Sequence, residues 1–258
     1  MAPTVRARLR EASLEAGERV VEGFERWMLR YSEVPNTPFL DPATFDWVAT
    51  LESGWRDMRA ELDRVLVHRE HLPNFQDISP DVASITDDDQ WKTLFFYGYG
   101  YRSEANCERC PMTAALLDQV PGMMTAFFSI LYPHKHVDEH RGPYRGVLRY
   151  HLGLKIPKDV EACGISVGGE VRHWAEGGSL VFDDGYQHFV WNDTDEERVV
   201  LFMDVVRPFR RPAAEVNRGL LKAISVSPFV RDAKRRHEAW ERGFEAQASQ
   251  PGRTRPDS

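Results

Sequence analysis

The sequence is poor in cysteine, with only Cys107, Cys110 and Cys163 among 258 residues. An odd and sparse set of thiols does not build the disulfide framework of a small secreted domain, so we expect reduced cysteines. The Cys107-x-x-Cys110 spacing is typical of half a zinc site or of a redox dithiol, but no second pair completes a tetrahedral site. A structural role is the simpler interpretation.

Long apolar runs are also missing. The longest mostly apolar stretch, residues 122–132, falls short of the roughly 20 residues that a membrane-spanning helix requires. Positive charge is in deficit, because 33 Lys and Arg stand against 40 Asp and Glu, a net charge of −7. This total disfavours non-specific binding to nucleic acid or an anionic membrane. No apolar block follows Arg6, Arg8 and Arg10, so we expect a cytoplasmic protein.

The composition, with 42% hydrophobic and 28% charged residues, is typical of a folded globular protein. In the middle of the chain, short apolar runs alternate with Gly, Pro, Asp and Asn, which is typical of a β-sandwich or barrel. The strands expected there are 125–132, 147–154, 179–182, 189–192 and 198–206. The chain is expected to divide into an N-terminal helical segment and connection (1–90), a β core (91–210), C-terminal helices (211–245) and a disordered tail (246–258).

The helical regions carry start and stop signals. Apolar residues at three- and four-residue steps predict a helix over residues 5–31. Asp41 as N-cap and Pro42 at the first helical position predict a second helix, whose apolar face continues to Val65. Near the C-terminus the helical pattern is interrupted at Pro228.

Six of the nine histidines lie in the strand-rich region, which suggests a metal site. A single histidine is usually an exposed or hydrogen-bonded residue, so crowding alone is weak support. The six are His134, His136, His140, His151, His173 and His188.

Strand periodicity gives a sharper indication. Over residues 147–154, Arg149 and His151 share one face, while Tyr150 and the leucines form the other. Arg198 begins a strand whose other members are apolar except Asp204. Such an arginine either extends its head into solvent or binds an anion, and a carboxylate held by two parallel hydrogen bonds suits it well.

A set of motifs covers the region from about Trp91 to Pro208. They are Cys107-Glu-Arg-Cys-Pro-Met-Thr113, Ile-Leu-Tyr-Pro133, His140-Arg-Gly-Pro143, Leu148-Arg-Tyr-His-Leu-Gly-Leu154, Trp174-Ala-Glu-Gly177, Phe182-Asp-Asp184, His188-Phe-Val-Trp-Asn192, Arg198 and Asp204-Val-Val-Arg-Pro208. In this order they resemble the aspartyl/asparaginyl β-hydroxylase family of iron- and 2-oxoglutarate-dependent oxygenases. The most specific part is Arg-x-His-Leu-Gly-Leu together with Phe-Asp-Asp-x-x-x-His-x-x-Trp.

The resemblance implies a mainly β fold, namely a double-stranded β-helix (jelly roll, cupin-like) core with flanking N- and C-terminal α-helices. It implies that His140 and His188 are the catalytic metal ligands and hold Fe(II), with O2 and 2-oxoglutarate as cosubstrates. Four residues would bind 2-oxoglutarate, the first two at its far carboxylate and the others near its metal-chelating end: Arg198, Ser129, Arg149 and His151.

Two registers compete for the first metal motif. Most non-haem iron oxygenases of this kind use two imidazoles and one carboxylate, in a His-x-Asp…His order. His136-Val-Asp138 matches this motif. His140-Arg-Gly142 has glycine in place of the carboxylate, which resembles the animal members of the family, where water is thought to replace the carboxylate. The surrounding Arg-Gly-Pro favours His140. Asp138 and Glu139 would then reach a metal-bound water from farther away.

Two other features leave alternatives open. Trp91 and the aromatic run over residues 95–101 suit either the core or the lining of a substrate cleft. Asp183 and Asp184 precede Gly185, so they either cap a turn or shape the metal pocket.

The resemblance predicts an enzyme, a 2-oxoglutarate-dependent dioxygenase (hydroxylase) that oxygenates a C–H bond and releases succinate and CO2. We expect an amino acid, peptide or protein side chain as substrate, because no membrane anchor is visible. Three alternatives stay open: a lipid A acyl-chain hydroxylase of the same family, a cupin-like metalloenzyme without a 2-oxo acid, and a non-catalytic jelly-roll metal-binding or sensor protein. No nucleic-acid partner is expected, and homo-oligomerisation stays open.

Overall fold

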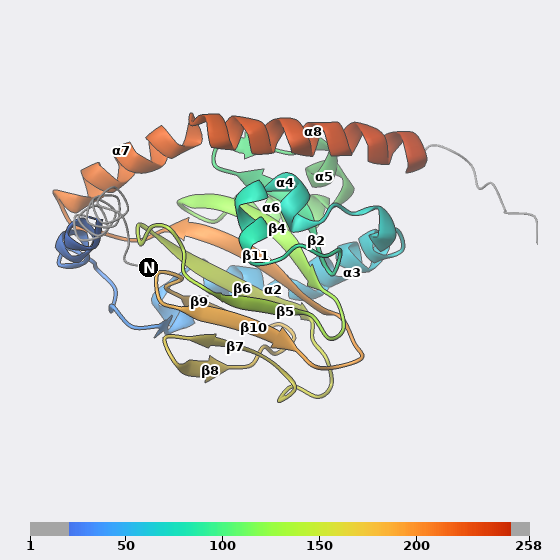
Figure 1. The fold of residues 1–258 in the computed structure, drawn as a ribbon, viewed down its shortest axis with the longest axis horizontal. Helices are drawn as coiled ribbons and strands as arrows, with labels where there is room; N and C mark the ends of the chain where they lie inside the picture. The colour runs from blue at the N-terminus through green and yellow to red at the C-terminus, as the bar shows by residue number, and fades with distance from the viewer. Residues whose placement is uncertain (1–20, 249–258) are drawn as a thin grey trace, which may run out of the picture.

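The computed structural model describes residues 21–248 (Figure 1). Two antiparallel sheets form the centre, a seven-stranded sheet in the order β1-β9-β6-β11-β4-β2-β3 and a four-stranded sheet in the order β5-β10-β7-β8. The strands are β1 Phe39–Leu40, β2 Trp91–Gly98, β3 Tyr101–Arg102, β4 Met123–Leu131, β5 His136–His140, β6 Val147–Lys155, β7 Cys163–Val167, β8 Glu170–Arg172, β9 Ser179–Phe182, β10 His188–Asn192 and β11 Arg198–Val206.

The two sheets enclose a hydrophobic cluster. Phe202 of β11 points into it from the large sheet, and Ile165 and Val190 point into it from the small one. Alternate residues of β11 belong to a second cluster on the other side of the large sheet. This arrangement confirms the jelly-roll core and the alternation predicted for strands 147–154 and 198–206.

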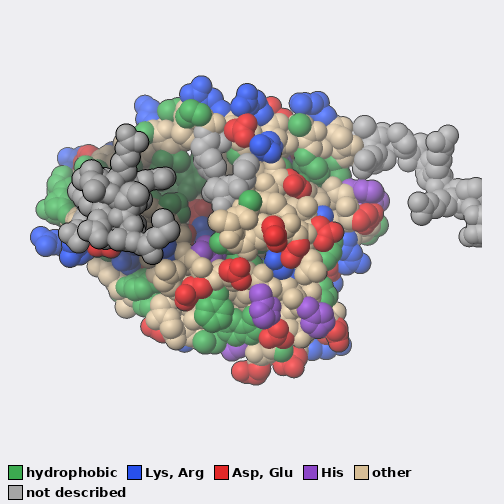
Figure 2. Space-filling view, viewed as in Figure 1, with side chains coloured by type: hydrophobic (Ala, Val, Ile, Leu, Met, Phe, Trp, Pro, Cys, Tyr) green, Lys and Arg blue, Asp and Glu red, His purple; other side chains and the backbone are tan. Residues whose placement is uncertain are grey.

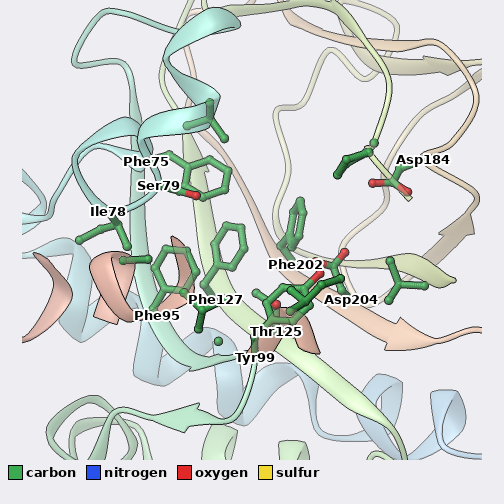
Figure 3. Close-up of a pocket in the computed structure, with 18 of the residues that line it drawn as sticks. Phe75, Ile78, Ser79, Phe95, Tyr99, Thr125, Phe127, Asp184, Phe202 and Asp204 are labelled. Atoms are coloured by element: carbon green, nitrogen blue, oxygen red, sulfur yellow. The ribbon is translucent and has the colours of Figure 1, made fainter. Parts of the chain in front are cut away.

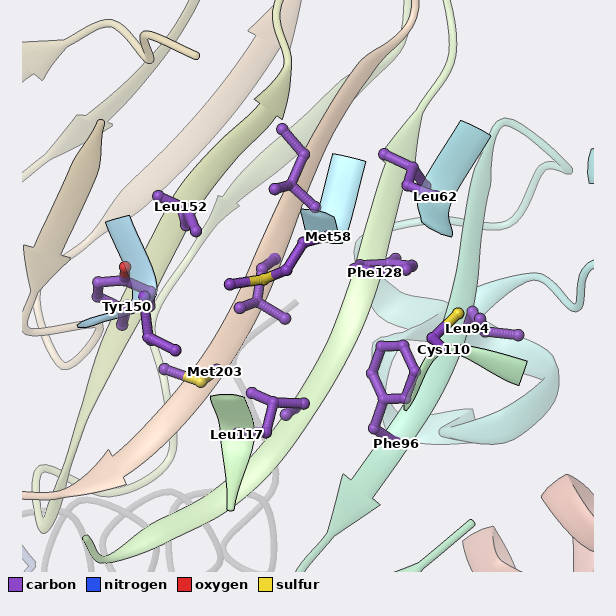
Figure 4. Close-up of a cluster of buried hydrophobic side chains, with 14 of the residues drawn as sticks. Met58, Leu62, Leu94, Phe96, Cys110, Leu117, Phe128, Tyr150, Leu152 and Met203 are labelled. Atoms are coloured by element: carbon purple, nitrogen blue, oxygen red, sulfur yellow. The ribbon is translucent and has the colours of Figure 1, made fainter. Parts of the chain in front are cut away.

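Helices cover the outer face of the seven-stranded sheet. Met58 and Leu62 share one buried cluster with Phe128 of β4 and Met203 of β11 (Figure 4). The helices are η1 Pro42–Thr44, α2 Val48–Ser53, α3 Trp55–Leu66, η2 Arg69–His71, α4 Phe75–Ile78, η3 Pro80–Ser84, α5 Glu104–Arg109, α6 Pro111–Leu117, α7 Ala213–Ser225 and α8 Pro228–Ala248. The last of them, α8, runs along one edge of the molecule (Figure 1).

The prediction of a single helix that begins at Asp41 is wrong, because the segment forms η1, α2 and α3 in succession. Asp41 does act as a cap, since its Oδ1 accepts a hydrogen bond from the N–H of Ala43 at 2.9 Å. The chain breaks again at Gly54, where a Cβ atom would lie 2.4 Å from the Leu116 side chain of α6. A glycine at this position allows α6 to approach closely.

Parts of the terminal predictions lie outside the described residues, including Arg6, Arg8 and Arg10. The helix predicted over residues 5–31 is seen over 21–29. At the other end α8 continues to Ala248, and the interruption at Pro228 is confirmed. No helix in the described part of the chain is long and apolar enough to cross a membrane.

The buried carboxylate of Glu61 joins α3 to the first turn of α6. It accepts hydrogen bonds from the N–H groups of Met112 and Thr113, at 2.9 and 2.8 Å, and from the Thr113 hydroxyl at 2.6 Å. These N–H groups have no partner within the helix. Because Gln offers only one acceptor oxygen, we expect Glu61→Gln to lower the free energy of unfolding by about 1–3 kcal/mol in urea denaturation.

Asp63→Asn is the matched control on the same helix. Asp63 is exposed and pairs with Arg59 at 2.9 Å, so its loss should change the free energy of unfolding by no more than about 0.5 kcal/mol. Equal losses in the two variants would contradict a linking role for Glu61.

Candidate active site

Two imidazoles lie against each other where β5 ends and β10 begins. His140 pairs with His188 across the two strands, and their ring centroids are 4.1 Å apart. The Nδ1 of His140 lies 2.7 Å from the carbonyl oxygen of Asp138, and that of His188 lies 2.9 Å from the carbonyl oxygen of Tyr186. Because a carbonyl only accepts, each Nδ1 carries the proton and each Nε2 keeps a free lone pair, as in metal-binding histidines.

Both imidazoles are in the neutral form that binds a metal. Burial, with the nearby charge of Arg149, lowers the pKa of His188 to about 3. Burial also lowers the pKa of His140 below its usual value. No group of three or more His, Cys, Asp or Glu side chains arranged for a metal occurs in the described residues. The donor set therefore fits a metal with two protein ligands and open positions, and not a closed structural site.

The structure separates the two candidate registers. His136 is exposed, and its Nε2 lies 2.7 Å from Oδ1 of Asp193. Asp138 and Glu139 are exposed as well. Only His140 of the two β5 histidines is brought to a second imidazole.

Asp184 occupies the space that a side chain at position 142 would fill. A Cβ on Gly142 would lie 2.3 Å from Oδ2 of Asp184. The same Oδ2 pairs with Nη2 of Arg149 at 2.9 Å, whereas the buried Oδ1 has no hydrogen-bond partner. Burial raises the pKa of Asp184, although Arg149 opposes the shift. A carboxylate therefore stands at position 142, where the usual motif has its acid, but it comes from the turn before β10.

The neighbouring Asp183 has a structural role. Its Oδ1 accepts a hydrogen bond from the N–H of Gly185 at 3.0 Å, and it pairs with Arg145 and with the fully buried Arg207, the latter at 2.7 Å. Arg207 in turn donates to Oδ1 of Asn36, far back in the chain, at 2.7 Å. Of the two alternatives for this acidic pair, Asp183 fixes the turn and Asp184 lines the pocket.

Arg198 is buried between the sheets without an acidic partner. Its side chain is 2% exposed, and its Nε and Nη1 have no hydrogen-bond partner. Burial lowers the pKa of Arg198 to about 10. Its guanidinium lies 4.6 Å from the Trp174 ring, and Nε1 of Trp174 and both ring nitrogens of His151 are also buried without partners. Such a cluster of unused donors is complementary to a carboxylate, and the solvent-facing alternative for Arg198 is wrong.

The other two predicted cosubstrate residues, Ser129 and Arg149, lie on the strands that flank β11, namely β4 and β6. Ser129 faces Val200, two positions from Arg198 on the same side of the sheet. Its hydroxyl accepts a hydrogen bond from Nε1 of Trp91 at 3.0 Å, which leaves its own proton free to donate. Arg149 is already engaged, because it pairs with Asp184 and donates from Nε to Asp204 at 3.1 Å.

A cavity of about 660 Å³ opens beside His140 and Asp184 (Figure 3). Its wall contains a row of aromatic rings, with Phe95 stacked on Phe127 at 4.4 Å and Phe127 stacked on Phe202 at 4.3 Å. The volume lies within the range of about 300–1,000 Å³ typical of small-molecule sites. Part of the predicted aromatic run thus lines a cleft, as one of its two interpretations proposed.

The C-terminal helices form another wall of the cavity. Ile224, Val230, Ala233 and His237 line it. Charged side chains at the wall are paired, for example Lys234 with Glu238 and Arg141 with Glu25.

Cys107 and Cys110 are buried free thiols near the start of α6. Burial raises the pKa of both, that of Cys110 to about 12. A protonated thiol is a poor metal ligand and a poor nucleophile, so the zinc and redox interpretations find no support here.

Comparisons with known proteins agree with the motifs. A family model described as aspartyl/asparaginyl beta-hydroxylase matches residues 52–208. An ornithine lipid ester-linked acyl 2-hydroxylase from Rhizobium tropici is 46% identical over 229 residues, which make up 89% of this chain and 82% of that protein.

Other similar proteins match less of the chain. Human aspartyl/asparaginyl beta-hydroxylase is 33% identical over 172 residues, 64% of this chain, and the match spans 22% of the human protein. Among solved structures, a prolyl-4-hydroxylase from Pseudomonas putida aligns with 60% of this chain and 88% of its own, at 18% identity and a TM-score of 0.41.

The unpaired charge of Arg198 leads to a prediction about stability. Removing a buried charge that has no partner should stabilise the fold, so we expect Arg198→Met to raise the free energy of unfolding by about 1–4 kcal/mol. If the Arg198 cluster is a site for 2-oxoglutarate, as the resemblance implies, this compound should raise the melting temperature of the wild type and not that of the variant, because only a ligand that binds the native state raises it.

Arg207→Met is the matched control, because Arg207 is equally buried but pairs with Asp183. Its loss should destabilise the fold by about 3–5 kcal/mol. Thermal denaturation with and without 2-oxoglutarate measures both variants. A destabilised Arg198→Met protein that still responds to 2-oxoglutarate would contradict the assignment.

Proposed function

Because the chain belongs to the aspartyl/asparaginyl β-hydroxylase family, we propose that it is an Fe(II)- and 2-oxoglutarate-dependent enzyme that hydroxylates the acyl chain of a membrane lipid. The observation that carries the choice of substrate is the largely apolar cavity beside His140, whose wall contains a row of stacked aromatic rings. The hydroxylase names of its relatives support the reaction class.

His140 and His188 would hold the iron through Nε2, because their Nδ1 protons are engaged by backbone carbonyls. Iron bound there, with 2-oxoglutarate and O2, supplies the oxidant that hydroxylates an unactivated C–H bond and releases succinate and CO2. The Oδ1 of Asp184 has no hydrogen-bond partner in the structure and would be available to accept one from a ligand at this site.

Arg198 would bind the far carboxylate of 2-oxoglutarate through its unused guanidinium N–H groups, and Ser129 would donate from its hydroxyl to the same carboxylate. His151 and Trp174 offer further donors along the cosubstrate. Arg149, held by Asp184 and Asp204, lies between this pocket and the cavity. The protein thereby fixes the cosubstrate before the substrate arrives, which lowers the entropic cost of reaction.

The cavity suits a hydrocarbon chain better than an amino acid. A free amino acid would place an ammonium and a carboxylate in a wall whose charged groups are already paired, and burying them without partners is costly. A methylene chain needs only apolar contact, which Phe95, Phe127 and Phe202 provide.

The similar proteins also favour a lipid substrate. The lipid acyl hydroxylase from Rhizobium tropici resembles this chain over most of both proteins, whereas the human relative shares only part of its length. The lipid alternative is therefore preferred here over the amino acid, peptide or protein side chain first expected. An ester-linked acyl chain of an aminolipid such as ornithine lipid is the specific candidate.

The metal assignment leads to a prediction with an internal control. His140→Ala should abolish Fe(II)-dependent conversion of 2-oxoglutarate to succinate, because a single imidazole does not retain the metal. His136→Ala, four residues away and paired with Asp193, should keep wild-type turnover. Succinate release and bound iron measure both variants, and equal loss in the two would refute the choice of register.

Mass spectrometry tests the substrate. With Fe(II) and 2-oxoglutarate, the protein should add one oxygen atom to the acyl chain of an ornithine lipid in neutral detergent, and none to peptides containing Asp or Asn. Hydroxylation of the peptides alone would overturn the proposal.

Blocking the cavity gives an independent readout. Ala233→Trp should lower lipid hydroxylation at least about tenfold while 2-oxoglutarate still raises the melting temperature, because the indole fills the acyl site but not the Arg198 pocket. Ala239→Trp, on the exposed side of α8, is the control and should behave as wild type.

A further inference from the structure

The net charge of −7 conceals a basic region. Between Arg210 and Arg242 there are nine Lys or Arg and four Asp or Glu, a local net charge of +5 that leaves −12 on the rest of the chain. This stretch contains α7 and most of α8. Figure 2 shows blue side chains along the edge of the molecule where Figure 1 places α8. The total charge, which led us to expect no binding to an anionic membrane, is an average that hides this region.

The cations and the acids of this stretch differ in exposure. All nine cations are exposed, whereas three of the four acids are partly buried. Asp232 is shared by Arg235 and Arg236, and Glu241 turns inward to bind Ser103 and His237. We call the exposed cations of α7 and α8 the basic surface; its members are Arg218, Lys222, Arg231, Lys234, Arg235, Arg236 and Arg242.

The inner sides of the same helices form a wall of the proposed acyl cavity. Ile224 of α7 and Val230 and Ala233 of α8 line it. Where the two helices meet, Val226 is 59% exposed and adds an apolar side chain next to the cations. The helices that carry the positive charge therefore also bound the apolar cavity.

We propose that the basic surface docks the protein on a bilayer that contains anionic lipids and thereby brings an acyl chain to the cavity. The inference rests on the proposed function, since only a lipid substrate makes the contact useful. Near an anionic leaflet each Lys or Arg strengthens binding about fivefold, and the attraction fades within about 8 Å at physiological salt. Several exposed cations on adjoining helices therefore suffice for reversible binding without a membrane-spanning segment.

Vesicle co-sedimentation tests the docking without any turnover. The full-length protein should bind phosphatidylcholine vesicles containing about one third phosphatidylglycerol, bind pure phosphatidylcholine weakly, and dissociate at high salt. The triple variant Arg231→Gln, Arg235→Gln, Arg236→Gln should lose at least about tenfold in affinity. Glutamine keeps the helix propensity close to that of arginine, and none of the three residues lines the cavity.

The control removes the same charge elsewhere. Arg56→Gln, Lys158→Gln, Arg172→Gln changes three exposed residues outside α7 and α8 and should bind anionic vesicles like the wild type. Equal binding to both kinds of vesicle, or equal loss in the two triple variants, would overturn the proposal. So would stronger binding to duplex DNA than to anionic vesicles in a competition assay.

A second measurement separates failure of the docking from failure of the function. Acting on ornithine lipid in neutral detergent, the α8 triple variant should match the wild type, while on anionic vesicles it should be slower. Hydroxylation in detergent without charge-dependent vesicle binding would overturn the docking alone. Charge-dependent binding without hydroxylation of any lipid would support a membrane contact and overturn the proposed function.

Discussion

The guanidinium of Arg198 lies between two sheets with no anion beside it. The packing around it must offset the free-energy cost of burying that charge. An unpaired buried charge costs about 3–5 kcal/mol, which only a well-packed surround can offset. The twisted strand β11 fixes the backbone, and the Trp174 ring lies 4.6 Å from the charge. Burial also lowers the pKa of His140 and His188, so the burial that leaves Arg198 without a partner also keeps the two proposed metal ligands neutral.

Much of this site could be predicted from local patterns. Period-two alternation placed Arg149 and His151 on one face and Arg198 among apolar neighbours, whereas His140 and His188 were named through the family resemblance, because the local His-x-Asp pattern alone favours His136. These signals are local because side-chain direction in a strand depends on the residue's own position. The strand ending at His140 was not predicted, since its exposed residues hide the alternation.

The rest depends on contacts between distant segments. Nothing near Gly142 indicates that a carboxylate 42 residues later fills its place, and nothing near Gly54 indicates that Leu116 lies above it. The C-terminal helices were expected as additions, yet they wall the cavity and concentrate positive charge. The wall of the cavity thus combines core strands, which carry Phe95, Phe127 and Phe202, with helices outside the core, and such added elements are where proteins of one fold can differ in substrate.

The ion pair between Asp183 and Arg207 determines which N-terminal residues a shortened form of the protein must keep. Arg207 also binds Asn36, so the segment before β1 is tied to the turn that precedes His188. Trimming the protein to its jelly roll would remove that acceptor and loosen the loop that aims the second imidazole. The N-terminal extension thus serves as a brace for the catalytic loop, and a minimal catalytic fragment must begin upstream of the first strand.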